Sequence, residues 1–385
     1  MTRQRFVTLL VLALLVITAA IWLSSQRSLR RDDTAGARAL PALSSSLNQV
    51  SEVRLVKAGD ETAVTLKRAD SHWQVGERAD YPADSSKIRK LLIDLSDLKV
   101  VEQKTENPAN YAVLGVEDVK EPTAKGVRVD IAGLAQPVSL IVGKNAGSRS
   151  SYARPAQSAQ SLAVTPSISL DTDPKEWLDR SLLDIPAPRV QQVRITDANG
   201  HSYVAKRESR DQADFTVPDL PKGRKLTSPT IANSASTALG ALTFDDVRPA
   251  AAPPTSPKGV ARAEFRLFDG TVIEITGRKD GEHHWIHVQP RFDEAQQQLF
   301  AVAAAPAVSE AADAKAADAK APPVDGEEKP AAPNATPAPA AERRPDEVRA
   351  EAENWAKRFA AWDYEVPGYK YDTLFRPLDE ITQKP

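Results

Sequence analysis

The side chains most suggestive of chemistry in this sequence are three histidines in the segment His283-His-Trp-Ile-His287, because histidine is a common metal ligand. On a β-strand, His283 and His287 would share one face but lie about 13 Å apart. A bound metal would have to lie within roughly 2.1 Å of both ring nitrogens. His284 would point to the opposite face. We therefore interpret these histidines as structural or surface residues.

A serine and a lysine in Ser96-Asp-Leu-Lys99 have the Ser-x-x-Lys spacing of some acyl-transfer enzymes. Those enzymes also need Ser-Asp-Asn and Lys-Thr-Gly elements, which this sequence lacks. The neighbouring Leu95 and Leu98 continue an apolar helical pattern, so we interpret the segment as the end of a core helix. Gly-rich phosphate loops and the motifs His-Glu-x-x-His and Gly-x-Ser-x-Gly are absent as well.

Two pairs of acidic residues, Asp245–Asp246 and Glu327–Glu328, raise the question of hydrolysis, which requires a carboxylate geometry that sequence does not reveal. The first pair follows a predicted helix and has Glu102 near its counterpart position, which favours a solvated loop. Trp and Tyr side chains could line a glycan groove, but most fall on predicted apolar strand faces. The sequence therefore predicts no catalytic, cofactor-binding or metal-binding residues.

Composition excludes several classes of protein. The chain of 385 residues has a formal net charge of -2, and its Lys and Arg residues are scattered, which argues against a nucleic-acid surface because phosphates need a basic patch. Cysteine is absent, so disulfides, thiol nucleophiles, zinc–thiolate sites and lipidated cysteine anchors are impossible. Hydrophobic content of 41% is that of a globular protein.

The N-terminal segment Phe6–Leu23 is apolar except for Thr8 and Thr18. As a helix it would be about 27 Å long, just enough to span a bilayer core. A cleaved signal peptide is the alternative, with Thr18-Ala-Ala20 as its cleavage site. The apolar run continues through Trp22 and Leu23, and Trp suits a membrane interface. This favours an uncleaved anchor, which with its flanks comprises residues 1–31.

The rest of the chain resembles itself. Val50-Ser-Glu-Val-Arg-Leu55 is similar to Val190-Gln-Gln-Val-Arg-Ile195, and further matches follow in the same order in both halves. The paired segments are 81–103 with 225–247, 127–133 with 263–270, and 138–144 with 271–279. Chance similarity would not preserve order, so we expect one unit used twice.

Periodicity predicts the elements of this unit. Alternating apolar residues predict strands around Val53, Val64, Trp73, Val127 and Val138 in the first copy. A helix is predicted between them: Asp84 can cap it, and a face of apolar residues repeats at helical spacing. In the second copy Ser228 is the predicted cap and Pro229 the first helical residue. Strands on both sides of one helix, joined by short loops, predict an α+β fold with an antiparallel sheet and the helix on one face. The helical apolar residues are Ile88, Leu91, Leu92, Leu95 and Leu98, and Ile231, Ala235, Ala238, Leu239 and Leu242.

These patterns define the expected domains. The first α+β repeat spans residues 48–165, and a helical connector, started by Asp173-Pro174, spans 166–189. The second repeat comprises 190–300 and 346–381. Between these two parts, 302–345 is rich in Ala and Pro, and such a sequence cannot bury enough apolar surface to offset the entropy of ordering it. We expect a disordered insertion there.

The motifs Trp73, Tyr81-Pro-Ala-Asp84, Tyr152-Ala-Arg154 and Trp177-Leu-Asp-Arg-Ser-Leu-Leu183 resemble those of a bacterial family, domain of unknown function 4340. The resemblance covers roughly residues 50–300 and the C-terminal segment 362–378. The long Ala/Pro insertion departs from the family pattern. The resemblance implies a single-span protein of the inner membrane with most of its chain in the periplasm or outside the cell, encoded beside components of a gliding-motility-type ABC transporter. It supplies no catalytic residues.

Three functions follow as hypotheses. The leading one is a non-enzymatic accessory or scaffold protein of a cell-envelope complex, anchored by Phe6–Leu23, with an ABC transporter membrane or auxiliary subunit as its partner and no nucleic acid. The alternative is an extracytoplasmic ligand-binding module, for example for a polysaccharide, with a cleft between the two units. A hydrolase with dispersed carboxylates is the third.

Overall fold

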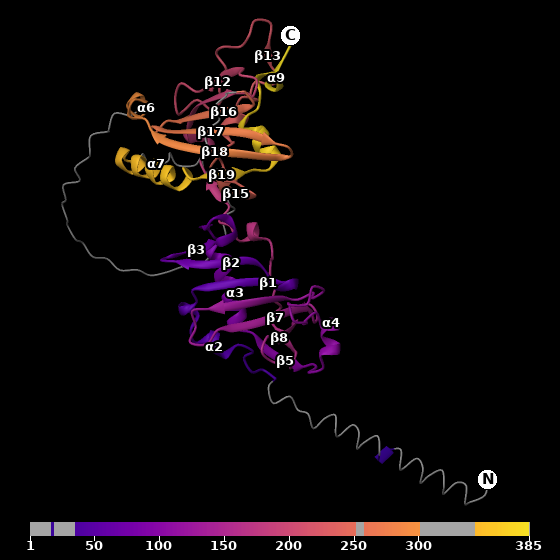
Figure 1. The fold of residues 1–385 in the computed structure, drawn as a ribbon. Coiled ribbons are helices and arrows are strands. Elements are labelled where there is room, and N and C mark those ends of the chain that lie inside the picture. Colours follow the sequence, from indigo (N-terminus) through magenta and orange to yellow (C-terminus); the bar gives the residue numbers. More distant parts are fainter. Residues whose placement is uncertain (1–16, 19–34, 252–257, 301–342, 385) are drawn as a thin grey trace, which may run out of the picture. The chain divides into compact units, whose positions relative to one another are not determined.

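The computed structural model describes residues 17–18, 35–251, 258–300 and 343–384. The chain forms two compact units, unit 1 up to Asp179 and unit 2 from Arg180 onward (Figure 1). Both are α+β structures with antiparallel strands, as the sequence predicts for the fold class. Among the described residues no helix is long and apolar enough to cross a membrane. The predicted span Phe6–Leu23 lies outside them except for Ile17 and Thr18.

Unit 1 contains one nine-stranded sheet in the order β4-β3-β2-β1-β6-β7-β8-β9-β5. Period-2 alternation aligns its apolar residues: Val53 stands opposite both Leu66 and Ile131, and all three are buried. The strands are β1 Glu52–Lys57, β2 Glu61–Ala69, β3 His72–Val75, β4 Tyr81–Pro82, β5 Lys99–Gln103, β6 Val127–Ala132, β7 Val138–Asn145, β8 Ser151–Pro155 and β9 Leu162–Thr165.

The predicted helix of unit 1 is α3, Ser85–Ser96. The side chain of Asp84 accepts hydrogen bonds from the N–H groups of Ser86 and Lys87, so it satisfies donors that the first turn leaves without partners. The buried residues of α3 repeat at helical spacing and cover the apolar face of the sheet. Shorter helices are α2 Pro41–Ser44 and α4 Tyr111–Leu114, with one-turn 3₁₀ helices at 47–49, 58–60, 76–78, 108–110 and 174–177.

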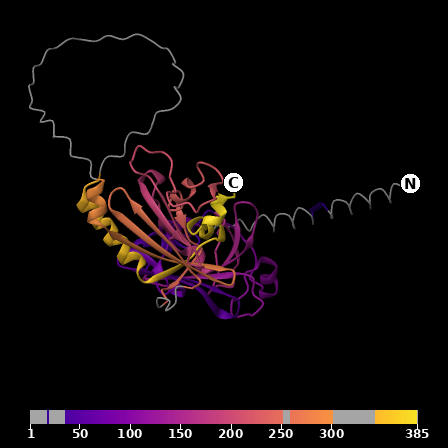
Figure 2. The same ribbon diagram turned by 90° about the horizontal axis from the view of Figure 1, so that it is seen from above.

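Unit 2 contains a seven-stranded sheet in the order β12-β11-β16-β17-β18-β19-β15. Its strands fan out as expected of a twisted sheet (Figure 2). The strands are β11 Val190–Thr196, β12 Ser202–Lys206, β15 Asp246–Pro249, β16 Val260–Leu267, β17 Thr271–Asp280, β18 His283–Phe292 and β19 Trp362–Glu365. Two further pairs join β10 Ser181–Leu183 to β14 Leu242–Thr243, and β13 Lys225–Leu226 to β20 Thr382–Gln383.

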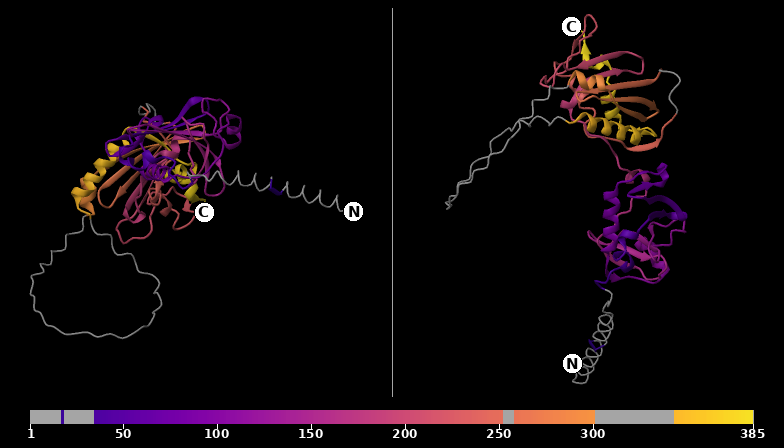
Figure 3. Two further views of the ribbon diagram at one scale, coloured as in Figure 1. Left: turned by 90° about the horizontal axis from the view of Figure 1, so that it is seen from below. Right: turned by 90° about the vertical axis from the view of Figure 1, so that its left-hand side faces the viewer.

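Helices from the end of the chain cover the apolar face of this sheet. The longest, α7 Pro345–Phe359, runs along β18 (Figure 3), and its buried Phe359 contacts Tyr364 of β19 edge to face. Gly277 on β17 leaves room for α8, because a Cβ there would come within 2.4 Å of Phe375. The other helices are α5 Asn233–Ser236, α6 Glu294–Leu299, α8 Gly368–Leu374 and α9 Leu378–Ile381, with a 3₁₀ turn at 187–189.

The two sheets share one strand order. From β2 to β5 unit 1 reads β2-β1-β6-β7-β8-β9-β5, and unit 2 reads β12-β11-β16-β17-β18-β19-β15. The pairing of Arg54 with Asp130 corresponds to that of Arg194 with Glu264. Unit 1 differs by the additional strands β3 and β4 at one edge.

The helix predicted for the second repeat is much shorter in the structure than the sequence pattern indicates. Instead of a helix that begins after Ser228, the structure has only the single turn α5, which starts after Ala232 without a side-chain cap. The hydroxyl groups of Ser234, Ser236 and Thr237 donate to backbone carbonyls three residues earlier. Such local hydrogen bonds compete with a regular helix.

The predicted helical connector is also different. Residues 166–189 contain the one-turn helix Pro174–Trp177, in unit 1, and the strand β10, in unit 2. Asp173 caps the turn by accepting from the N–H of Lys175, but the chain is extended again at Leu178. The Ala/Pro-rich insertion 302–345 lies outside the described residues up to residue 342. Its last residue, Pro345, is the first residue of α7.

Candidate functional site: a buried aspartate on the open face of unit 2

The most deeply buried charged side chain in the described part of the chain is Asp363 on β19, whose exposed fraction is 1%. Its Oδ2 atom lies 3.1 Å from Nη2 of Arg278 and 3.8 Å from Nε of Arg248. Its Oδ1 atom lies 3.3 Å from Nδ1 of His287. The N–H of Ala251 donates to Oδ2 at 3.3 Å. We call Asp363, Arg248, Arg278 and His287 the Asp363 cluster.

Strand register gathers this cluster from four strands. Arg248 on β15 stands opposite Asp363, Trp285 on β18 stands opposite Glu365, and Arg278 on β17 stands opposite Trp285. The neighbouring residues Ile286 and Tyr364 are buried on the other face, against the helices. Because side chains alternate along a strand, the cluster lies on the face that α7 does not cover. We call it the open face of unit 2.

An aromatic ring completes the cluster. The guanidinium of Arg248 lies 3.8 Å from the centre of the Trp285 ring, within the range of a cation–π contact. Stacking on Trp285 orients Arg248 toward Asp363 while part of its side chain, 37%, stays exposed. The arginine is therefore held by two neighbours on the sheet.

Electrostatics favour the charged forms of Asp363 and His287. Burial, the strongest influence, pushes the pKa of Asp363 upward, but hydrogen bonds from His287 and from the N–H of Ala251, together with the charge of Arg278, outweigh it and leave the pKa lowered. The hydrogen bond to Asp363 raises the pKa of His287 against the opposing effect of burial. Nδ1 of His287 also lies 2.9 Å from the carbonyl oxygen of Trp362, so this nitrogen carries a proton and Nε2 is the atom that titrates.

The three histidines of the sequence motif have separate surroundings. His283 Nδ1 lies 2.5 Å from Glu365 Oε1, and this contact raises the pKa of His283. His284, on the opposite face, packs its ring 5.1 Å from that of Tyr371. Within the described residues no three His, Asp or Glu side chains come together in a way that could hold a metal.

The other sequence candidates are also apart from one another. Ser96 is buried and donates to the carbonyl oxygen of Ile93 within α3, whereas Lys99 is exposed on β5. The Oδ1 atom of Asp246 accepts from the N–H of Val247 on the edge strand β15. Glu102 pairs with Lys104 at 2.6 Å. The pair Glu327–Glu328 lies outside the described residues.

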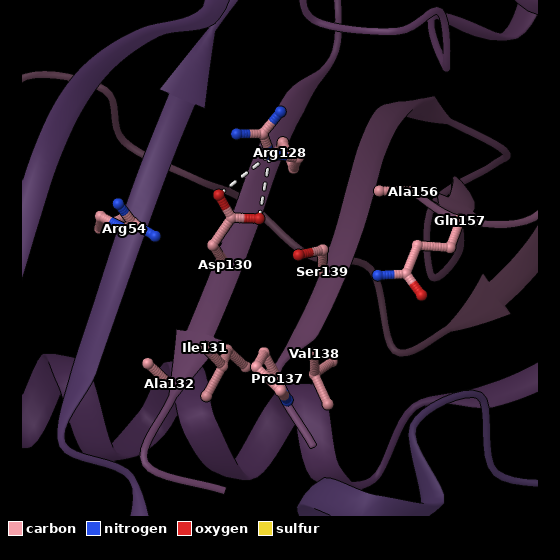
Figure 4. A pocket seen from close by; sticks show the side chains of 10 residues that line it. All are labelled: Arg54, Arg128, Asp130, Ile131, Ala132, Pro137, Val138, Ser139, Ala156 and Gln157. Atoms are coloured by element: carbon pink, nitrogen blue, oxygen red, sulfur yellow. Dashed lines mark hydrogen bonds and ion pairs between the residues drawn. The ribbon is translucent and has the colours of Figure 1, made fainter.

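Unit 1 has a shallow hollow of about 300 Å³ on the corresponding open face (Figure 4). Arg54, Arg128, Asp130, Ser139 and Gln157 supply its polar groups. Figure 4 shows Arg128 bound to both carboxylate oxygens of Asp130, at 2.9 and 3.0 Å from Nε. Arg128 also pairs with Asp60 at 3.0 Å. Its guanidinium is thus occupied by acids of the same unit.

Chemically, the Asp363 cluster of unit 2 and the hollow of unit 1 both contain charges that bind one another. A general acid or base needs a lone pair or proton directed at a reactant, but the Asp363 carboxylate accepts from groups on all sides. Such faces can bind another surface through the groups that remain partly exposed. Arg248, which lies over the Trp285 ring, is such a group. They are suited to recognition by surface contact.

Sequence reasoning missed the Asp363 cluster. Asp363 belongs to Trp362-Asp-Tyr-Glu365, and this ending was assigned only to the completion of the second domain. A signal was present: an acid that alternates with large aromatics on a predicted strand faces away from the core, where it requires partners. Which cations would meet it depends on the register of β15, β17 and β18, and one sequence does not fix that register.

Comparison with known proteins gives one match. The sequence model of the family Domain of unknown function (DUF4340) matches residues 73–262. No curated protein and no solved structure matches significantly. The matched stretch begins in β3 and ends in β16, and it includes α3 and the Trp177-to-Leu183 motif. Residues 73–262 of this chain therefore belong to the DUF4340 family.

Proposed function

We propose that this protein is a non-enzymatic accessory or scaffold protein of the cell envelope. In this proposal Phe6–Leu23 anchors it in the inner membrane, units 1 and 2 lie outside the cytoplasm, and the partner is a membrane or auxiliary subunit of an ABC transporter. The open faces of the two sheets are the contact surfaces. The proposal also includes the origin of units 1 and 2 by duplication of one ancestral unit.

The observation that carries the proposal is the mutual pairing of charges on the open faces. Asp363 is engaged by two arginines, a histidine and a backbone N–H, and Arg128 by two aspartates. Charges held in fixed positions but still partly exposed, such as Arg248, can give a surface specificity toward a partner with complementary charges. A pocket for a small molecule would enclose most of the ligand's surface, whereas the hollow of unit 1 is shallow.

The duplication is supported by two independent observations. Sequence matches keep the same order in both halves, and the seven shared strands have the same spatial order in both sheets. The long connection from β18 to β19 in unit 2 contains the residues of the Ala/Pro-rich insertion. In unit 1 the counterparts β8 and β9 are joined by a short turn, residues 156–161.

Co-purification from native membranes tests the function. Full-length protein, extracted in mild detergent, is expected to carry an ABC transporter membrane subunit with it. Arg248→Glu reverses the charge of the partly exposed cation in the Asp363 cluster and should reduce the amount of partner recovered. The matched control is Lys357→Glu on the exposed face of α7, which should leave the recovery unchanged. Recovery of no transporter component, together with saturable binding to an envelope polysaccharide, would support the ligand-binding alternative instead.

A further inference from the structure

Residues 36–39, near the start of the long described stretch 35–251, are a fixed part of unit 1. The N–H of Gly36 donates to the carbonyl oxygen of Val100 at 2.8 Å, and the N–H of Val100 donates to that of Ala37 at 2.9 Å. Residues 36–39 thus extend the sheet beyond its edge strand β5. Leu40 and Leu43 follow and are buried at 6% and 0% exposure. We call residues 36–39 the entry arm.

The entry arm limits the distance of β5 from the proposed membrane anchor. The predicted span ends at Leu23, and residues 24–35 connect it to Gly36. Twelve residues reach at most about 43 Å in any conformation. Strands are about 4.8 Å apart in a sheet, so β3, seven positions from β5 in the strand order, lies about 34 Å from β5. The chain thus enters unit 1 at its β5 edge, which is the part of the sheet closest along the sequence to the predicted span.

This side exposes apolar side chains. Val113 on α4 is 68% exposed and Val101 on β5 is 47% exposed. Between Asn107 and Val116 the sequence has no charged residue, and Pro108, Ala109 and Ala112 are exposed as well. In Figure 1 α4 and β5 lie at one end of unit 1 and β3 at the other. We call Val101, Pro108, Ala109, Ala112 and Val113 the apolar tip.

The apolar tip is held in place by the fold. Tyr111 of α4 is buried, and its hydroxyl donates to the carbonyl oxygen of Ala159. Its ring packs 4.7 Å from the guanidinium of Arg154 on β8. Lys144 Nζ donates to the carbonyl oxygen of Val113 at 2.8 Å, which satisfies an acceptor at the end of α4. These contacts hold α4 in a position in which the Val113 side chain is exposed.

We propose that the apolar tip contacts the phospholipid bilayer in which Phe6–Leu23 is anchored, with Val113 placed in the headgroup region. This inference rests on the anchor of the proposed function. Transfer of apolar side chains from water to the boundary between headgroups and acyl chains is favourable. A second contact beside the span would orient unit 1 with its β5 edge toward the membrane. The partner surfaces would then be presented at a defined height above the bilayer.

Single-cysteine labelling in the full-length chain tests the contact, since the natural sequence contains no cysteine. Val113→Cys and, as a second tip position, Ala112→Cys carry an environment-sensitive fluorophore. The control is Ser71→Cys in the exposed turn between β2 and β3. The proteins are reconstituted into vesicles of phosphatidylethanolamine and phosphatidylglycerol, with or without lipids spin-labelled near the headgroup. Flotation of the vesicles first establishes that each protein is anchored.

Quenching by the spin-labelled lipids is expected to be about threefold or more stronger at positions 112 and 113 than at position 71, because the tip lies in the interface. Proteins that float but show equal quenching at all three positions would overturn the contact while leaving the anchor and the proposed function intact. Equal quenching is also the result expected if a partner protein covers the apolar tip in the cell, because these vesicles contain no partner. Proteins that do not float would overturn both the anchor and the contact.

Discussion

Units 1 and 2 use the same strand order but treat the open face of the sheet differently. In unit 1 the segment 104–126 after β5 folds over part of this face, where Tyr111 and Val116 form a small second core with Ile141 of β7. In unit 2 the corresponding segment between β15 and β16 is shorter, 250–259. Arg154 of β8, at the position that corresponds to His287, is buried beneath this cover, with its Nε bonded to the carbonyl oxygen of Val116.

This difference indicates where function has room to vary. A covered face needs side chains that satisfy one another within the core, as Arg154 does with backbone carbonyls. In unit 2 the Arg248 side chain stays partly exposed beside its buried counter-charge Asp363. The strand order sets the positions, and in unit 1 the segment 104–126 makes some of them part of a core. On this account unit 2 carries the more informative contact surface.

The covered apolar faces also differ, because unit 1 uses α3 and unit 2 uses α7. Phe359→Ala should lower the free energy of unfolding of unit 2 by about 3–5 kcal/mol, since it removes a fully buried ring. Leu95→Ala in α3 should lower that of unit 1 by about 2–5 kcal/mol. Hydrogen exchange of peptides from each unit during urea unfolding measures both. Lys357→Ala, on the exposed side of α7, is the control, and a loss as large as that of Phe359→Ala would contradict the assigned packing.

The Asp363 cluster gives the next largest effect. Asp363→Asn should destabilise unit 2 by about 2 kcal/mol at pH 7, because it leaves Arg278 and Arg248 without their buried counter-charge, although both can still reach water. His283→Gln, at an exposed contact, should change unfolding much less. Chemical denaturation of the two variants decides the point. Equal stability of Asp363→Asn and the natural protein would show that the cluster contributes nothing to folding.

The same cluster predicts how stability changes with pH. The pKa of His287 is raised in the folded protein, so its contribution is complete below the unfolded value of about 6.5 and is lost as the pH rises through the folded value. The pKa of Asp363 is lowered, so its contribution is present above about pH 3.9 and is lost as the pH falls through the folded value. Unfolding of unit 2, measured from pH 5.5 to 8.5, should lose the His287-dependent part in the Asp363→Asn variant. An unchanged profile in that variant would contradict the assignment.

The smallest expected difference concerns the helix caps. Asp84→Ala should lower the free energy of unfolding of unit 1 by about 1 kcal/mol, because the Asp84 side chain accepts hydrogen bonds from two N–H groups of α3. Ser228→Ala, the position predicted from sequence to do the same in unit 2, should change stability by less than about 0.5 kcal/mol, because Ser228 caps no helix in the structure. Burial, the largest single influence, raises the pKa of Asp84, but the hydrogen bonds donated by Ser86 and Lys87 outweigh it and leave the pKa lowered. The stability that the Asp84 carboxylate contributes to unit 1 should therefore be lost as the pH falls through this lowered pKa. Equal losses in the two variants would favour a longer helix in unit 2.

The contrast between α3 and α5 shows what sequence reasoning can and cannot provide. Leucines at helical spacing behind an aspartate cap predicted α3, and alternation predicted strands such as β1 and β6, because these signals are local. The second helix was misjudged because Ala at helical spacing outweighed the serine and threonine hydroxyls that bind backbone carbonyls. The Asp363 cluster was missed because it depends on four strands coming into register. The role of α7 was missed because it follows a long insertion.

Photocrosslinking in intact cells tests the central claim, that the open faces are partner surfaces, most directly. A photoreactive amino acid is placed at Gln289 on the open face of unit 2 and, for comparison, at Glu353 on the exposed side of α7. The account predicts that Gln289, but not Glu353, forms an adduct with an integral membrane subunit of an ABC transporter. Adducts of equal yield at both positions, or no adduct with any membrane protein at Gln289, would contradict it.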